Sequence, residues 1–110
     1  MEDAAEPILI YSTFSDLANA ETVAERLIAE RLGACVNLIE NVKSFFEWEG
    51  KLQKEHEIVM LIKTVRRLEA DVMDFITRHH SYNEPAILVL PITGGADGYL
   101  EWAVGQVKQG

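Results

Sequence analysis

Residues 34–64 read ACVNLIENVKSFFEWEGKLQKEHEIVMLIKT, and this stretch decides the fold. Apolar and polar side chains alternate on both sides of Glu49-Gly50, which is typical of two β-strands joined by a tight turn. Glycine suits the turn because it adopts a positive φ without steric cost. We therefore predict a β-hairpin over residues 35–64. Five apolar side chains of its first strand are expected to share one face: Val36, Leu38, Val42, Phe46 and Trp48.

The predicted hairpin is long for this chain, whose 110 residues are enough for one domain. Arms of roughly 14 residues at about 3.3 Å each reach about 46 Å. A compact domain of this length is only about 34 Å across. The hairpin must therefore project beyond its domain or bend sharply. Because the far end carries Phe45, Phe46 and Trp48, we expect another subunit to cover it.

The segment before the hairpin predicts a strand and a helix. Ile8–Phe14 is a short apolar run that reads as a buried strand. Residues 15–33 follow with apolar side chains at helical spacing, and Ser15 or Asp16 is the expected N-cap, with Gly33 at the end. The inward face of this helix is predicted to hold Leu17, Ala20, Ala24, Leu27, Ile28 and Leu32.

The segment after the hairpin predicts a second helix over residues 64–80, with Thr64 as its cap. Its inward face is expected to hold Leu68, Val72, Phe75, Ile76 and His79. Residues 86–92 are expected to form a fourth strand, and Pro91 points to a sheet edge or a bulge. The following TGGADG reads as a plain loop, since it lacks the lysine and the glycine spacing of phosphate-binding loops.

A short third helix, capped by Asp97, is predicted to end the chain. The order β-α-β-β-α-β with this added helix is that of a ferredoxin-like α+β sandwich. Such a sandwich has a four-stranded antiparallel sheet with both main helices on one face, so the other face is left open for a partner. We expect residues 1–110 to form one domain, with residues 1–7 flexible.

The composition excludes several classes of partner. The chain has 10 basic and 18 acidic residues, a net charge of −8, which argues against nucleic acid and anionic membranes. The single cysteine, Cys35, cannot form an internal disulfide. The start MEDAAEPILIYSTF lacks the basic region of a secretory signal, and no apolar run is long enough to span a bilayer. A reducing cytoplasm is the expected location.

Several motifs together resemble the divalent-cation-tolerance family known as CutA. These are ACVN after the first helix, WEGK at the turn, EIVMLIKT in the returning strand, and HHSYNEPAILVLP near the end. The resemblance runs from about Ile8 to Val107. It implies a tight homotrimer in which long hairpin strands pair across subunit boundaries, and a kinship to PII signalling proteins. It further implies a role in tolerance of copper and other divalent metals, with no enzymatic reaction.

His79, His80 and Glu84 are the candidate metal ligands. Neutral imidazole suits copper and zinc, and a carboxylate adds an oxygen ligand. Adjacent helical residues point about 100° apart, however, so the two histidines share one ion only where the chain leaves the helix. The alternative is structural: His79 at a helix C-terminus complements the helix dipole, and His80 and Tyr82 fill a subunit seam.

The resemblance adds a second view of the metal site. Copper-binding relatives carry a cysteine where this chain has Ser12, a histidine matching His79, and an acidic residue where this chain has Ala86. Serine is a poor ligand for copper and alanine is none. Any copper binding is therefore expected to be weak or to be built differently, for instance with Glu84.

An intersubunit cleft is expected to be lined by Trp48, Lys63 and Tyr82, with the lysine holding an anion. The alternative is that the lysine forms an ordinary ion pair beside core aromatics.

Cys35 is expected to be buried and inert rather than the nucleophile of a hydrolase. Four acids of the hairpin are expected to form a solvated surface: Glu47, Glu49, Glu55 and Glu57.

We expect a non-enzymatic trimer that acts in divalent-ion tolerance by binding. No cofactor is required on this interpretation, and copper or another divalent cation is the candidate ligand. The alternative is a PII-like signalling trimer that binds small anions or partner proteins.

Overall fold

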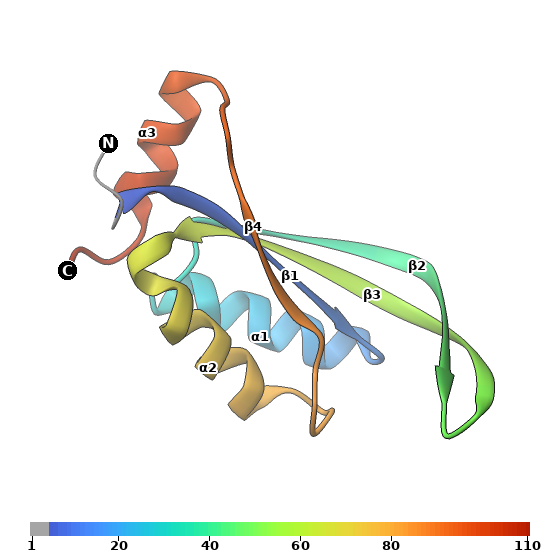
Figure 1. Ribbon diagram of the computed structural model, residues 1–110. Coiled ribbons are helices and arrows are strands. Elements are labelled where there is room, and N and C mark those ends of the chain that lie inside the picture. Colours follow the sequence, from blue (N-terminus) through green and yellow to red (C-terminus); the bar gives the residue numbers. More distant parts are fainter. Residues whose placement is uncertain (1–4) are drawn as a thin grey trace.

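The computed structural model describes residues 5–110, and the predicted hairpin dominates it (Figure 1). Strands β2 (Cys35–Trp48) and β3 (Lys51–Val65) pair antiparallel. Glu49 and Gly50 join them with φ of 51° and 77°. Two central residues with positive φ match the right-handed twist of the flanking strands, and this is why the Glu49-Gly50 turn forms.

The sheet has the order β2-β3-β1-β4, and each neighbouring pair is antiparallel. Strand β1 (Pro7–Phe14) lies in the interior and β4 (Ile87–Pro91) at an edge, which suits the proline. The predicted α+β architecture is thus confirmed. Of the segment predicted to be flexible, residues 1–4 lie outside the described residues, and Pro7 already pairs with Val65.

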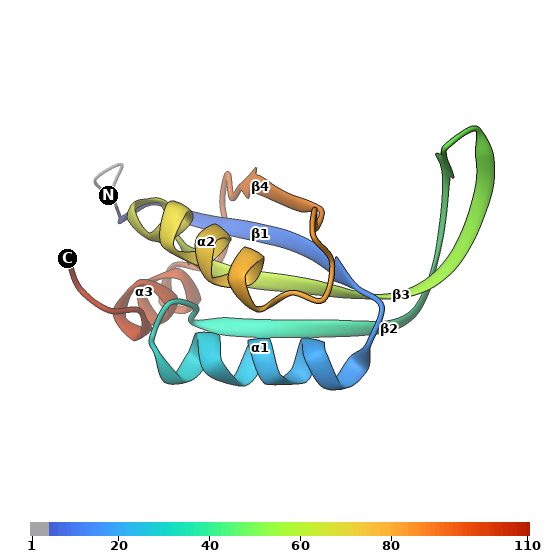
Figure 2. The ribbon, with the colours of Figure 1, turned by 90° about the horizontal axis from the view of Figure 1, so that it is seen from below.

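Within residues 5–110, three α-helices accompany the sheet: α1 (Leu17–Ala29), α2 (Glu69–His79) and α3 (Asp97–Gln106). A short 3-10 turn, η2 (Arg66–Leu68), leads into α2. Helices α1 and α2 cover one face of the sheet, and α1 runs along β2 (Figure 2). The largest fully buried side chains are Phe14, Phe75, Ile8, Ile10, Leu27, Met60, Ile62, Ile76, Val23, Val65, Val72 and Val107.

The sequence predicted the start of α1 correctly but not its end. Asp16 is the N-cap, and its carboxylate accepts a hydrogen bond from the Ala18 N–H at 2.9 Å, as predicted. The helix ends at Ala29 rather than near Gly33, because Arg31 takes the left-handed conformation that reverses the chain, with φ of 57°. Ile28, predicted to point inward, is 44% exposed.

Two other predicted caps are wrong. Thr64 belongs to β3, and its buried hydroxyl donates to the Leu32 carbonyl at 2.7 Å instead of capping α2. Asp97 is the first residue of α3, and the N-cap position before it is Ala96. Asp97 still lies in the first turn of α3, where its negative charge interacts favourably with the positive end of the helix dipole.

A β-bulge divides β2 into two parts. Ile39 pairs with Val59 but Val42 pairs with Glu57, so β2 carries one extra residue, and Asn41 takes a φ of 62°. One extra residue reverses which side chains face each side of the strand. The prediction of a single apolar face is therefore wrong: Val36 and Leu38 face the helices, whereas Phe46 and Trp48 face the opposite side.

The hairpin beyond the bulge, residues 42–57, is called the tip below. It projects from the domain and also curls away from the side covered by α1 (Figure 2). The molecule measures 45 × 26 × 22 Å along its principal axes. The length of the arms required the hairpin either to project or to bend, and in the structure it does both.

No helix among the described residues is long and apolar enough to cross a membrane.

Candidate functional site

The curl of the tip creates a groove of about 800 Å³. The inner face of the tip forms one wall, and the β1–α1 corner and the loop between α2 and β4 form the others. Its lining residues are Thr13, Ser15, Phe46, Trp48, Gln53, Glu55, Glu57, Tyr82, Asn83, Glu84 and Ala86. The groove brings together Trp48, Tyr82 and Glu84, three of the residues predicted from the sequence to form sites.

Glu57 and Tyr82 tie the tip to the α2–β4 loop. The Tyr82 hydroxyl donates a hydrogen bond to Glu57 Oε2 at 3.0 Å. Burial raises the pKa of Tyr82, so the phenol keeps its proton and remains a donor at neutral pH. Glu57 is only 9% exposed, so the prediction that it belongs to a solvated acidic surface is wrong. Alternation along β3 places it on the face opposite to the buried Ile58, toward the groove.

His80 is held in place at both ring nitrogens. Nε2 donates to the Thr13 carbonyl at 2.7 Å, and Nδ1 accepts from the Tyr82 N–H at 2.9 Å. This arrangement defines the neutral tautomer with its proton on Nε2. The ring stacks on Phe14 at 4.1 Å between centroids. Burial lowers the pKa of His80, which also favours the neutral ring.

His79 is also engaged at both ring nitrogens. Nδ1 donates to the Phe75 carbonyl at 2.9 Å, which leaves Nε2 to accept from the Arg26 guanidinium at 3.1 Å. The ring stacks on Phe75 at 4.2 Å between centroids. His79 therefore joins α2 to α1 and closes the last turn of α2.

The three candidate metal ligands do not assemble in one chain. Within residues 5–110, no group of three or more His, Cys, Asp or Glu side chains is placed to hold a metal ion. The histidine nitrogens are occupied, and Glu84 is exposed at the groove. Ser12 lies fully buried, its hydroxyl without a hydrogen-bond partner among the described residues. These residues do not fit a resident copper ion.

Lys63 lies away from Trp48 and Tyr82. Its ammonium sits 5.3 Å from the centre of the Tyr99 ring and donates to Cys35 Sγ at 3.8 Å. The Tyr99 hydroxyl raises the pKa of Lys63, and the nearby Cys35 adds to this effect, so the lysine stays charged. Within one chain, the groove and the surroundings of Lys63 are therefore two separate places.

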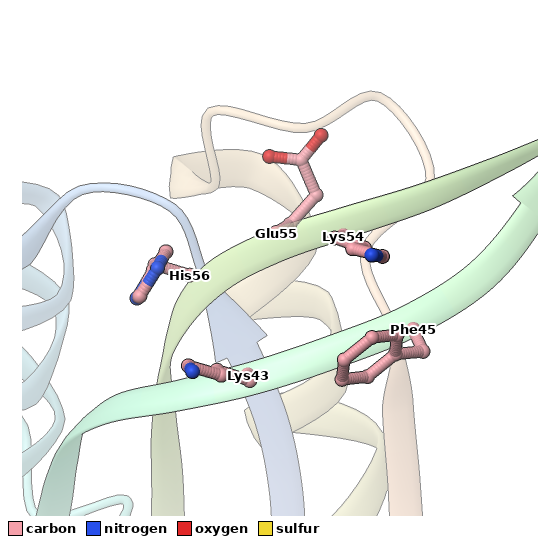
Figure 3. Close-up of a pocket in the computed structure, with 5 residues that line it drawn as sticks. All are labelled: Lys43, Phe45, Lys54, Glu55 and His56. Carbon is pink, nitrogen blue, oxygen red and sulfur yellow. The ribbon is translucent and has the colours of Figure 1, made fainter.

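The outer face of the tip has the opposite chemistry to the groove. Lys43 pairs with His56 and Phe45 with Lys54 across the two strands. These four side chains and Glu55 border a shallow depression of about 260 Å³, and the carboxylate of Glu55 points in a different direction from the other four (Figure 3). Along β3, Glu55 and Glu57 belong to the inner face and Lys54 and His56 to the outer face; Lys51, opposite Trp48, is a base on the inner face, and Glu47 is an acid on the outer face. Alternation along β3 explains this separation, since odd-numbered and even-numbered residues face opposite sides.

The structure is of the α+β class. It has a four-stranded antiparallel sheet with helices on one face, an open second face, and a curled, projecting hairpin. Comparison with known proteins identifies the family. The profile described as "CutA1 divalent ion tolerance protein" matches residues 8–106. The chain belongs to this family, as the sequence motifs predicted. It is a family of non-enzymatic divalent-cation tolerance proteins.

Individual relatives agree with this assignment. The Divalent-cation tolerance protein CutA of Salmonella newport is 38% identical over 97 residues, which are 88% of this chain and 84% of that protein. Protein CutA, chloroplastic, of Arabidopsis thaliana is 38% identical over 95 residues, 86% of this chain, and the match spans about half of the Arabidopsis protein, 52%.

Solved structures share the fold. The crystal structure of CutA1 from Oryza sativa has a TM-score of 0.93 at 31% identity and covers 99% of this chain and 100% of that chain. The structure of the Periplasmic divalent cation tolerance protein CutA from Archaeoglobus fulgidus has a TM-score of 0.89 at 39% identity, covering 93% and 99% of the two chains.

Proposed function

We propose that this chain forms a homotrimer that contributes to divalent-ion tolerance by binding rather than by catalysis. The observation that carries the assembly is the apolar surface left uncovered by one chain. Trp48, Leu52 and Leu88 are 65%, 67% and 59% exposed. Burial of each such side chain stabilises by about 1.5–3 kcal/mol. Other copies of the chain are the covering partners.

The strand edges support the same assembly. Strands β2 and β4 are the two edges of the sheet, so each presents backbone groups on one side to a further strand. The long β2 offers more of these groups than a single domain requires. Pairing of edge strands between copies buries both the edges and the side chains of the tip.

Copper, the candidate ligand, is proposed to bind weakly. The histidine nitrogens must first leave their present hydrogen bonds, and Ser12 and Ala86 supply no soft ligand. We expect a dissociation constant above about 10 µM, equivalent to less than about 7 kcal/mol of binding free energy. The proposed location remains a reducing cytoplasm, where Cys35 stays a free thiol.

Sedimentation equilibrium at low micromolar concentration tests the assembly, and calorimetry with Cu²⁺ and Zn²⁺ at neutral pH tests the binding. The proposal expects a mass three times that of the 12.4 kDa chain. It also expects weak copper binding that a His79→Ala substitution alters. A folded monomer, or sub-micromolar copper affinity unchanged by His79→Ala, would contradict the proposal.

A PII-like role in binding small anions is the second candidate, and Lys63 favours it. The ammonium group is charged, half-buried, and forms no ion pair with a carboxylate among residues 5–110. Thermal-shift measurements with small carboxylates and nucleotides test this role. Stabilisation by one ligand class that disappears in Lys63→Gln supports it, and equal stabilisation of both proteins argues against it.

A further inference from the structure

One face of the sheet changes its chemistry along β3. Odd-numbered residues of this strand share a face, so Lys63 and Glu55 belong to one continuous surface. Near Lys63 this surface is the open face of the sheet, and near Glu55 it is the inner face of the tip. Helix α3, whose Tyr99 lies beside Lys63, and the tip are at opposite ends of the molecule (Figure 2). The surface therefore has two separate ends.

The end around Lys63 carries a cation among apolar side chains. Across the sheet, Lys63 lies between Cys35 of β2 and Leu9 of β1, and Leu90 of β4 completes the row. Leu90 and Tyr99 are 41% and 43% exposed, and Lys63 forms no ion pair with a carboxylate within residues 5–110. The next row on this face contains no acid either: Asn37, Leu61, Tyr11 and Leu88.

The end at the tip has the complementary chemistry. Phe46 and Trp48 are 43% and 65% exposed on the inner face. Glu55 is exposed there and forms no ion pair among the described residues, whereas Glu57 already has a hydrogen-bond partner. Lys51, opposite Trp48, lies close to the turn. Glu55 is therefore the inner-face acid that a cation from outside would meet.

The two ends do not meet within one chain. Glu55 and Lys63 are eight residues apart on β3, which is about 26 Å of extended strand. An ion pair requires about 4 Å or less between nitrogen and oxygen. Lys63 is also absent from the groove that the curled tip forms with its own domain. Any partner of either end is therefore on another molecule, and a second copy of this chain carries the complement of both.

We propose that the inner face of the tip of one copy lies on the open sheet face of the next copy, with Glu55 paired to Lys63 of that copy. The inference rests on the proposed homotrimer and names the contact that closes it. Different surfaces meet at such a contact, so each copy uses its tip once and its sheet face once around a ring. It assigns to Lys63 a carboxylate of a neighbouring copy in place of the small anion of the second candidate function.

Oxidative cross-linking of the full-length chain tests this contact. Cys35, the only cysteine, lies opposite Lys63 on the same face. A thiol introduced at the tip forms a disulfide with it only where the two Cα atoms come within about 7 Å. We expect Glu55→Cys, treated with a mild oxidant, to give bands at two and three times 12.4 kDa on a non-reducing gel. Adding Cys35→Ser to this variant should abolish the threefold band.

The matched control is Glu47→Cys, which places the thiol on the outer face of the same tip and should give no threefold band. An equal threefold band in Glu47→Cys and Glu55→Cys would show random collision and would overturn the proposal. A wild-type chain that sediments as a trimer, with no threefold band in Glu55→Cys, would overturn this contact and leave the homotrimer standing. A wild-type monomer would contradict the homotrimer itself.

Charge reversal tests the ion pair separately. Lys63→Glu should raise the concentration at which half of the assembly dissociates by about tenfold, because two carboxylates then face each other. Glu55→Lys added to Lys63→Glu should bring this concentration back to within about threefold of wild type. Glu47→Lys added to Lys63→Glu gives the same net charge and should not restore it. Equal restoration by both additions would show an effect of net charge and would refute the pairing.

Discussion

Replacement of His80 by alanine separates a structural histidine from a metal ligand. The substitution removes a donor to the Thr13 carbonyl at 2.7 Å and an acceptor for the Tyr82 N–H at 2.9 Å. It also removes the ring that stacks on the buried Phe14. Two half-buried backbone groups lose their partner at about 1 kcal/mol or more each, and the stack contributes about 0.5–1.5 kcal/mol. We expect a loss of about 2–4 kcal/mol of unfolding free energy.

Urea unfolding at a fixed chain concentration measures this loss, because the stability of an assembly depends on concentration. The pH dependence gives a second readout. The pKa of His80 is lower in the folded protein than its unfolded value of about 6.5. As the pH falls below about 6.5, the unfolded chain takes up a proton before the folded one, so the unfolding free energy decreases. His80→Ala should lack this part of the decrease.

The control is His56→Ala, which truncates an exposed histidine on the outer face of the tip. Its stability should change by less than about 0.5 kcal/mol. If His80→Ala were as stable as wild type and instead lost most of its affinity for Cu²⁺, the hydrogen bonds described here would not hold the ring. The reasoning that assigns His80 to the structure would then be refuted.

Three further substitutions test the fold around the site. Ser12→Ala should raise the unfolding free energy by about 1 kcal/mol in urea titration, because it removes a buried hydroxyl without a partner; a clear loss would contradict this. Asn41→Val should cost about 1–2 kcal/mol by the same assay, because a β-branched residue resists the φ of 62° in the bulge, and Asn41→Gly should cost little. Gly50→Val should lower the unfolding free energy by a similar amount. The cause is backbone strain at its φ of 77° alone, since an added Cβ meets nothing within 4 Å. An unchanged urea midpoint would argue against this strain.

The sequence was sufficient to predict the order of the elements because their signals are local. Alternation marked the strands, helical spacing marked α1 and α2, and the Glu49-Gly50 turn fixed the hairpin. The end of α1 was predicted wrongly because glycine is the usual left-handed residue, and here Arg31 adopts that conformation ahead of Gly33. Thr64 was predicted wrongly as a helix cap because its acceptor, the Leu32 carbonyl, lies 32 residues away in sequence. A local sequence pattern does not reveal such a partner.

The groove was predictable only in part. Trp48 and Tyr82 were expected in one cleft and do line one groove, whereas Lys63 lies elsewhere in the chain. Glu57 was missed as a groove residue because it was grouped with the other acids of the hairpin as a solvated surface, although regular alternation along β3 places it on the face opposite to Ile58. The face of Phe46 and Trp48 was predicted wrongly because alternation was extended through the bulge. Asn41 was the available signal for the bulge: asparagine tolerates a positive φ, and it interrupts an otherwise alternating strand.

The bulge at Asn41 has a consequence for reading related sequences. Every second position along residues 35–48 belongs to one surface before the bulge and to the other surface after it. Variant libraries designed by simple alternation would therefore alter the wrong side of the tip. Loss of one residue at this point in a relative would remove the bulge and leave each residue of the tip on its present face, because Val42 would still pair with Glu57.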